Sequence, residues 1–294
     1  MVRTLRHRKF RQDRSASNAL TVDVVSVLSI APVRTTEQFE RPLPVPAALR
    51  PWLTGVGRIP FLDDLATPFT HVPQAVTTVV IRVERSGRRD VAVIGPRTRA
   101  TYKQAEESAA CQRLRLAPAA VRPLLGVAAV ELTDRVRPLA DFPGPLAGFE
   151  DRLLHSTPDE ALRILENALP QSLSDAPEHH RQRRLLEAAT AALAEESIPV
   201  PEVAARLAIS ERQLRTLFAT GIGLSPKQFA RIGRIRRVLA DPSPDPLATT
   251  AATHGYYDQS HMNAEFRTLM GTAPSAYFRG ALPAATPCAT AFRT

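Results

Sequence analysis

The chain has 294 residues, 44% of them hydrophobic, which is enough for two ordinary domains that each bury a core. Its net charge of +9 lies at the two ends, because residues 1–14 carry six Lys/Arg against one Asp and residues 181–280 carry thirteen basic against nine acidic residues. Two cysteines, Cys111 and Cys288, exclude a four-thiolate zinc site and a disulfide-rich secreted framework, so we expect a reducing cytoplasm. A basic C-terminal part suits nucleic acid, although a solvated basic face explains the charge equally well.

Residues 1–40 form a basic N-terminal segment that we expect to be disordered. Its one apolar stretch, 19–31, contains Asp23 and is too short to span a bilayer. A signal peptide is therefore the weaker interpretation, and an extension that arises from the choice of start site stays open beside disorder. No other segment is apolar enough to cross a membrane, so we expect no membrane partner.

Residues 41–155 are predicted to form a small α+β domain that is rich in strands, with a barrel among the arrangements open to it. Its proline-dense start at 41–51 should run extended and contain no helix. Two apolar runs between 76 and 95 flank a turn at Gly87 and predict a hairpin. The alternating run CQRLRLAP predicts a half-buried strand, and a short helix should follow it and end near Gly126.

From residue 156 onward the spacing of apolar residues predicts helices only. We expect 156–197 to be a helical connector, 198–280 to be an all-α domain of two helix-turn-helix units joined by one helix, and 281–294 to be a flexible tail. The last connector helix has an apolar stripe of Leu185, Leu186, Ala189 and Leu193. The fold class is therefore α+β, with a strand-rich domain followed by an all-α domain.

A fourteen-residue phrase occurs twice in the C-terminal part, as FATGIGLSPKQFAR at 218–231 and FRTLMGTAPSAYFR at 266–279. Each copy follows a predicted helix, a turn and a second helix. Ser210 is a natural N-cap for the second helix of the first copy, with Gln213 three residues later, and Asp258 is the N-cap in the second copy. The spacing predicts two copies of one helix-turn-helix unit.

The residues that the two copies share are those that a scaffold requires. A phenylalanine fixes the second helix to the core, a glycine reverses the chain, a proline starts the next helix, and an aromatic residue folds that helix back. These pairs are Phe218 and Phe266, Gly223 and Gly271, Pro226 and Pro274, and Phe229 and Tyr277. Ala204 and Ala208 should be small because the helices approach each other there, and Gly255 corresponds to Ala208. The joining helix should end at Asp241-Pro242 and could hold the two units about 34 Å apart, one turn of DNA.

Residues 198–280 resemble the DNA-binding domain of AraC/XylS-type bacterial transcription regulators, which has two helix-turn-helix units joined by one helix. The resemblance rests on VAARLAISERQLRTLFATGIGLSPKQFARI and, more sharply, on GYYDQSHMNAEFRTLMGTAPSAYFR, close to the terminal signature of that family. Upstream, VIGPRTRATYK and RLAPAAVRPLLGVAAVELTDRVRPLADF resemble the N-terminal domain of a subgroup of these regulators. The resemblance implies a transcription regulator, an activator or a repressor, that binds double-stranded DNA and RNA polymerase. It also implies a front domain that senses a small-molecule effector or forms a homodimer, and no cofactor is expected.

The candidate DNA-reading side chains lie on the outward faces of the second helix of each unit. Arg212 and Arg215 are the strongest candidates, because a guanidinium can bond guanine O6 and N7 together and the family pattern places contacts there. The alternative is that they are solvated surface arginines. The base-reading candidates are Arg212, Arg215, Thr216, Gln259, Ser260, His261 and Asn263, and the phosphate-contact candidates are Lys227, Arg231, Arg267 and Arg279. Ala264 stands where related proteins often carry an arginine, so the second half-site could be read weakly or through the DNA backbone.

The remaining chemistry-bearing groups favour structural roles. Adjacent His179 and His180 diverge on one helix, so a metal site is not expected there. No catalytic motif supports an enzyme. The rival that stays open is a DNA-targeted enzyme with Cys111 as its reactive thiol, although a buried inert thiol fits that position better. A second rival is a protein-interaction module in which the repeat binds a partner helix.

Overall fold

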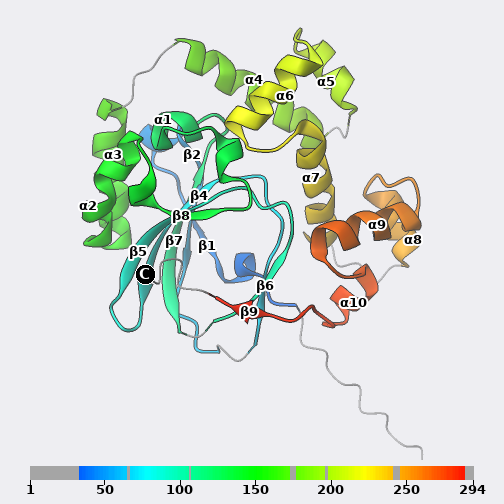
Figure 1. Ribbon diagram of the computed structural model, residues 1–294, viewed down its shortest axis with the longest axis horizontal. Coiled ribbons are helices and arrows are strands. Elements are labelled where there is room, and N and C mark those ends of the chain that lie inside the picture. The colour runs from blue at the N-terminus through cyan, green and yellow to red at the C-terminus, as the bar shows by residue number, and fades with distance from the viewer. Residues whose placement is uncertain are drawn as a thin grey trace, which may run out of the picture. The chain divides into compact units, whose positions relative to one another are not determined.

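The computed structural model describes residues 33–64, 67–105, 107–172, 177–195, 198–240 and 246–288 (Figure 1). The predictions for residues 1–32 and for the last six residues of the tail lie outside the described residues. Within the N-terminal segment, Thr36–Phe39 form the 3₁₀ helix η1, and Glu40 accepts hydrogen bonds from two strand arginines. The end of this segment is therefore part of the folded front of the molecule.

A six-stranded antiparallel sheet organises residues 33–172, which we call the front half, in the order β1-β2-β7-β4-β5-β8. The strands are β1 (Arg41–Leu43), β2 (Leu53–Ile59), β4 (Thr78–Glu84), β5 (Arg89–Ile94), β7 (Ala109–Leu116) and β8 (Val136–Pro138). The predicted hairpin is formed by β4 and β5, and Gly87 has a φ of 88° in its turn. The predicted alternating strand is β7, which lies between β2 and β4.

A second sheet has the order β3-β6-β9, with β3 (Phe69–His71), β6 (Thr101–Gln104) and β9 (Thr286–Pro287). The six-stranded sheet is open, so the front half is α+β but is not a closed barrel. The short strand β9 pairs in parallel with β6, where Lys103 lies opposite Thr286. The segment that we expected to be a flexible tail thus returns to the front half, because its backbone completes the exposed edge of β6.

The helices of the front half pack against the six-stranded sheet. They are η2 (Ala47–Leu49), α1 (Val121–Leu125), η3 (Ala129–Leu132), η4 (Leu139–Asp141), η5 (Pro145–Phe149), α2 (Glu150–Leu154) and α3 (Pro158–Ser172). The core between them contains Val56, Val79 and Leu114 of the sheet together with Leu124 of α1. Helix α1 ends at Gly126 in the left-handed conformation, as predicted. The helix-free prediction for 41–51 was wrong, because η2 needs only one turn and follows Pro46.

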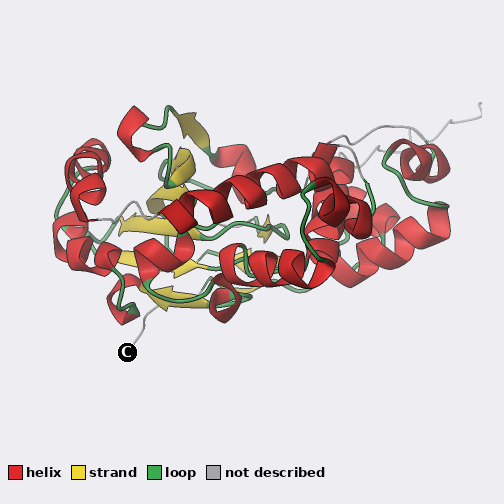
Figure 2. Cartoon of the chain, turned by 90° about the horizontal axis from the view of Figure 1, so that it is seen from above, coloured by secondary structure: helices red, strands yellow, loops and turns green. Residues whose placement is uncertain are grey.

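All elements that the structure describes within residues 177–280 are helices, as the apolar spacing predicts, and we call this part the helical half. Its helices are α4 (Pro177–Glu195), α5 (Val200–Arg206), α6 (Glu211–Gly221), α7 (Pro226–Ala240), α8 (Leu247–Thr253), α9 (Gln259–Met270) and α10 (Pro274–Phe278). Figure 2 shows the strands gathered on the left of the view, whereas the right side holds only helices and loops. In the part of the chain that the structure describes, no helix is long and apolar enough to span a bilayer.

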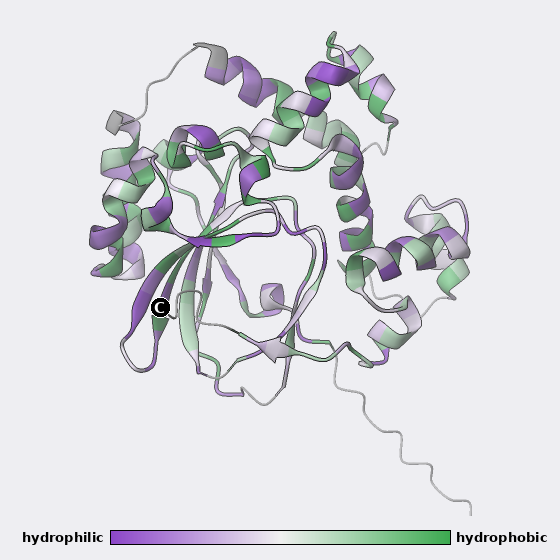
Figure 3. Ribbon diagram, viewed as in Figure 1, coloured by the Kyte–Doolittle hydropathy of each residue, from purple (hydrophilic) through white to green (hydrophobic). Residues whose placement is uncertain are grey.

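Helix α7 contributes to two hydrophobic cores, and hydrophilic and hydrophobic bands alternate along it (Figure 3). Ile232 packs into the first core with Phe218 of α6 and Leu186 of α4. Ile235 and Val238 pack into the second core. Because both cores share one continuous helix, α7 fixes the position of α6 relative to α9.

Candidate nucleic-acid interface

The first helix pair consists of α5 and α6, joined by a tight turn. Ser210 is the N-cap of α6, where its Oγ accepts a hydrogen bond from the Gln213 N–H at 3.2 Å and Gln213 Oε1 accepts one from the Ser210 N–H at 2.9 Å. This is the predicted capping box, which stabilises a helix start through two otherwise unpaired N–H groups. Ala208 is exposed and has a φ of 52°. The close-approach explanation for Ala208 was therefore wrong, since its backbone forms the turn, whereas Ala204 is buried as expected.

The outward face of α6 carries the predicted base-reading residues of the first pair. Arg212, Arg215 and Thr216 are exposed, while Leu214 and Phe218 on the opposite side are fully buried. Arg215 donates to Glu211 Oε2 at 2.5 Å, and the arginine side chain keeps 63% of its surface exposed. An exposed pair of this kind is worth at most about 1 kcal/mol, so a stronger partner can replace Glu211.

The second helix pair, α8 and α9, repeats this layout. Asp258 caps α9 by accepting the His261 N–H at 2.7 Å, as predicted, and Gly255 forms the turn with a φ of 73°. Gln259, Ser260 and His261 are exposed and lie in the first turn of α9. Asn263 is only half-exposed, and its Oδ1 is buried without a hydrogen-bond partner among the described residues. The exposed face of α9 therefore offers amide, hydroxyl and imidazole groups, beside the exposed Ala264.

A buried carboxylate ties α9 to α7. The Glu265 side chain is 3% exposed and accepts hydrogen bonds from Arg231 Nε at 2.8 Å, from Arg234 Nη2 at 3.3 Å and from the Tyr256 hydroxyl at 3.0 Å. Burial, and next the charge of Glu265, raise the pKa of Tyr256, which keeps its hydroxyl a donor. Sequence reasoning missed Glu265; the one signal was a lone carboxylate between the inward-facing Met262 and Phe266 of α9.

The phosphate-contact candidates fall into two groups. Lys227 in the first turn of α7, Arg267 on α9 and Arg279 after α10 are all exposed. Arg231 is half-buried and engaged with Glu265, so a structural role accounts for it without DNA.

The scaffold residues of the repeated phrase adopt equivalent geometry. The rings of Phe218 and Phe229 pack edge to face with centroids 5.6 Å apart, and those of Phe266 and Tyr277 do so at the same 5.6 Å. Gly223 and Gly271 have φ angles of 91° and 71°. Both parts of the prediction, the returning aromatic and the chain reversal at glycine, are confirmed.

The groups considered for other chemistry occupy structural positions. Burial raises the pKa of the Cys111 thiol to about 11, the direction opposite to that of a reactive thiolate. His179 stacks on Trp52 with ring centroids 5.8 Å apart. Within the ranges that the structure describes, no group of three or more His, Cys, Asp and Glu side chains could hold a metal ion.

Comparison with known proteins finds a known domain within the helical half. A family model described as a helix-turn-helix domain matches residues 203–280. The crystal structure of ToxT from Vibrio cholerae O395 is 10% identical in sequence, covers 78% of this chain and 97% of that chain, and gives a TM-score of 0.36. The structure of wild-type ToxT from V. cholerae strain SCE256 with a bound unsaturated fatty acid is 11% identical, covers 72% of this chain and 90% of that chain, and gives a TM-score of 0.32. No curated protein matches the chain.

Proposed function

Residues 203–280 form an AraC-type helix-turn-helix domain, and from this premise we propose that the protein is a sequence-specific transcription regulator that reads two successive major-groove segments of duplex DNA. The observation that carries the proposal is the repeated layout of α6 and α9. Each helix is capped at its start, buries one face in its own core and exposes polar side chains on the other face. The shared helix α7 supports a fixed separation of the two exposed faces.

The two reading helices contribute different chemistry to the proposed contact. Arg212 and Arg215 would contact guanine edges from α6, because a guanidinium matches the O6 and N7 acceptors of guanine. DNA would replace Glu211 as the partner of Arg215. From α9, Gln259, Ser260 and His261 would contact base edges, and Asn263 would have to rotate outward to do so. Thr216 completes the base-reading set, while Lys227, Arg267 and Arg279 would contact phosphates and set the register.

We extend the proposal to the front half as the regulatory part. A small-molecule effector, RNA polymerase and a second copy of the chain are the partners expected of such a regulator. In vitro transcription with purified RNA polymerase and the full chain, from a linear template that carries the selected site, tests the polymerase contact. An unchanged transcript level on adding the protein would contradict it.

Selection of bound duplexes from a random pool tests the central proposal with the full chain. We expect one enriched motif with two half-sites about 10 base pairs apart, and an affinity that falls steeply with salt concentration because bound phosphates release counterions. Footprinting on the selected site should protect both half-sites on one side of the duplex. A folded chain that enriches no duplex would contradict the proposal and favour a protein-interaction module.

A further inference from the structure

The turn of the second helix pair contains one residue more than the turn of the first pair. Ile209 and Tyr256 are equivalent, because each donates its N–H to the carbonyl five residues earlier, at 3.1 Å and 3.0 Å. In the first turn the N-cap Ser210 follows Ile209 directly. In the second turn Tyr257 stands between Tyr256 and the N-cap Asp258. Tyr257 is therefore an additional residue without a counterpart in the first pair.

The two tyrosines of the second turn lie in opposite environments. Tyr256 is 5% exposed, and its hydroxyl donates to Glu265. Tyr257 is 94% exposed, and within the ranges that the structure describes its side chain has no hydrogen bond, ring contact or cation–π contact. A single exposed aromatic residue is ordinary on a protein surface, so exposure alone assigns no role. The position of Tyr257, directly before the cap of a proposed reading helix, points to a partner outside the chain.

The front half contacts the proposed reading helices at their C-terminal ends. The Ala119 N–H donates to the Gly221 carbonyl of α6 at 3.1 Å, and the Ala100 N–H donates to the Leu269 carbonyl of α9 at 2.7 Å. Residues 257–261, which contain the start of α9, are all exposed. These contacts therefore leave the first turn of α9 uncovered.

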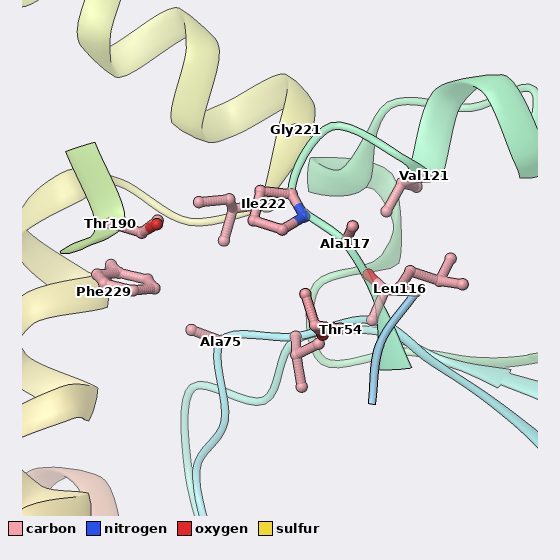
Figure 4. A pocket seen from close by; sticks show the side chains of 12 residues that line it. Thr54, Ala75, Leu116, Ala117, Val121, Thr190, Gly221, Ile222 and Phe229 are labelled. Carbon is pink, nitrogen blue, oxygen red and sulfur yellow. The ribbon is translucent and has the colours of Figure 1, made fainter. Parts of the chain in front are cut away.

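A pocket between the two halves also lies at the C-terminal end of α6 (Figure 4). Its volume is about 190 Å³, and in the close view Thr190 and Phe229 lie on one side and Leu116 lies on the other. Gly221, the last residue of α6, lines the pocket, whereas none of the described lining residues belongs to α9. The pocket therefore does not account for the exposed ring of Tyr257.

Tyr257 lies where the DNA backbone would pass in the proposed complex. The N-terminal residues of a reading helix contact base edges in the major groove, so the residue before its N-cap lies at the rim of the groove, beside the sugar–phosphate backbone. The carboxylate of Asp258 faces its own helix, because its Oδ1 accepts the His261 N–H at 2.7 Å. The adjacent Tyr257 side chain is thus presented to the backbone of the second half-site.

A tyrosine has two properties that suit a sugar–phosphate backbone. Its ring offers a large apolar surface to a deoxyribose, and its hydroxyl can donate to a phosphate oxygen. Neither contact needs a positive charge. The first turn of α9 exposes Gln259, Ser260 and His261, whereas α6 exposes two arginines. A contact by Tyr257 therefore adds binding at a helix start that has no arginine.

We propose that Tyr257 is a DNA-backbone contact of the second helix pair. Its hydroxyl donates to one phosphate oxygen of the second half-site, and its ring packs on the adjacent deoxyribose. The contact fixes the start of α9 at the rim of the groove and carries no sequence information. It deepens the proposed function and rests on it, because it requires that α9 lies in the major groove.

Band shifts of the full chain on the selected duplex measure the contribution of Tyr257 to affinity. Tyr257→Phe should weaken binding about fivefold, because one hydroxyl hydrogen bond is lost. Tyr257→Ala should weaken it about twentyfold, because the ring contact is lost as well. The matched control is Phe61→Ala, which removes a 40% exposed ring after β2 and should leave the affinity unchanged. Thermal unfolding of the Tyr257 variants should match that of the wild type, since this side chain packs against so little of the chain.

The dependence of binding on salt and on sequence separates an uncharged backbone contact from other roles. The slope of log affinity against log salt concentration should be the same in the wild type and in Tyr257→Phe, because a tyrosine releases no counterion. Arg267→Ala, which removes an exposed positive charge from α9, should reduce that slope by about 1. A changed salt slope in Tyr257→Phe, or a preference lost at one base pair in Tyr257→Ala, would overturn the backbone assignment.

Duplexes that each carry one uncharged methylphosphonate locate the contacted phosphate. At one position of the second half-site, this replacement should weaken the wild type about threefold more than it weakens Tyr257→Phe, because both changes remove the same hydrogen bond. At positions in the first half-site the two proteins should lose affinity equally. Equal losses at every position of the second half-site would overturn the contact.

Failure of the contact and failure of DNA binding give different results. A wild type that binds the selected duplex no better than Tyr257→Ala overturns the contact alone, and so does an equal loss in Phe61→Ala. A folded wild type that binds no duplex overturns the proposed function and the contact together.

Discussion

The two helix pairs share one scaffold but differ in what fixes their position and in what they expose. The capped starts, the turn glycines and the aromatic pairs at 5.6 Å are common to both. In the first pair α6 exposes two arginines, and the turn after it packs tightly on the front half. In the second pair the first turn of α9 exposes uncharged side chains, and α9 is tied to α7 through buried Glu265. The same scaffold thus presents two arginines for the proposed contact with DNA in the first pair and a buried attachment to α7 in the second.

The largest effect is expected from removing the buried carboxylate of the second pair, Glu265. Glu265→Ala leaves Arg231 and Arg234 without their shared partner, and breaking a buried pair costs about 3–5 kcal/mol of unfolding free energy. The matched control is Glu202→Ala, because Glu202 forms an exposed pair with Arg206 on α5 and should cost less than about 1 kcal/mol. Urea titration followed by circular dichroism measures both. Equal losses in the two variants would contradict the attachment role of Glu265.

The two equivalent turn glycines, Gly223 and Gly271, should respond differently to substitution. A Cβ on Gly223 would lie 2.6 Å from the Ala129 carbonyl oxygen, whereas a Cβ on Gly271 meets nothing within 4 Å. Both have a positive φ, so alanine is strained at either position by about 1–2 kcal/mol. Gly223→Ala should cost about 3 kcal/mol because backbone overpacking adds to this strain, and Gly271→Ala should cost the strain alone. Thermal unfolding of the two variants gives the order; a larger loss in Gly271→Ala would refute the tight packing of the first turn.

Sequence discrimination should depend more on the first pair than on the second. Arg215→Ala should lose about 1–3 kcal/mol of discrimination at one base position, because the bidentate contact to guanine is lost. Gln259→Ala should lose less than this if the second half-site is read weakly. Arg163→Ala, which removes the same charge from an exposed position on α3, is the control for general electrostatic effects. Competition band shifts with single-base variants measure discrimination, and an unchanged preference in Arg215→Ala would remove it from the reading set.

The smallest effect concerns the three-stranded sheet of β3, β6 and β9. His71 on β3 pairs with β6, the strand of Tyr102, and burial, followed by the charges of Arg97, Arg113 and Lys103, lowers its pKa well below the ordinary value. Below about pH 6.5 the unfolded chain takes up a proton that the folded chain does not, so stability is lost as the pH falls. His71→Gln should reduce this loss. Urea unfolding titrations between pH 7.5 and 5 measure this loss of stability in both proteins. The loss should begin near the ordinary histidine pKa of about 6.5. Parallel pH profiles for the two proteins would contradict it.

Several parts of the site followed from the sequence because they depend on neighbours three or four residues apart. Ser210 with Gln213, and Asp258, are capping patterns that need no tertiary partner. The aromatic pair within each copy was also predictable, because both copies place the two rings eleven residues apart on helices joined by a glycine turn. The outward positions of Arg212 and Arg215 follow from the 3.6-residue period of a helix whose opposite face is apolar.

Other parts could not be predicted, because their partners are distant in the sequence. Arg231 was predicted to contact phosphate, and nothing near it in the sequence indicates that Glu265 holds it. The pairing of β9 with β6 joins residues more than 180 positions apart, and apolar spacing gives no signal for it. The sequence also could not decide whether the six-stranded sheet is open or closes into a barrel, because alternation predicts a strand and does not predict closure.

The sequence alone determined two capped, duplicated helix pairs with a joining helix, a strand-rich domain before them and the exposed arginines of α6. Periodicity and capping are local properties, so residues that lie close together in the sequence specify them. The tertiary structure decided which charges are used internally, which carbonyls at the ends of α6 and α9 meet the front half, and where a pocket remains between them. These features depend on the packing of distant segments, because burial decides whether a polar group needs an internal partner.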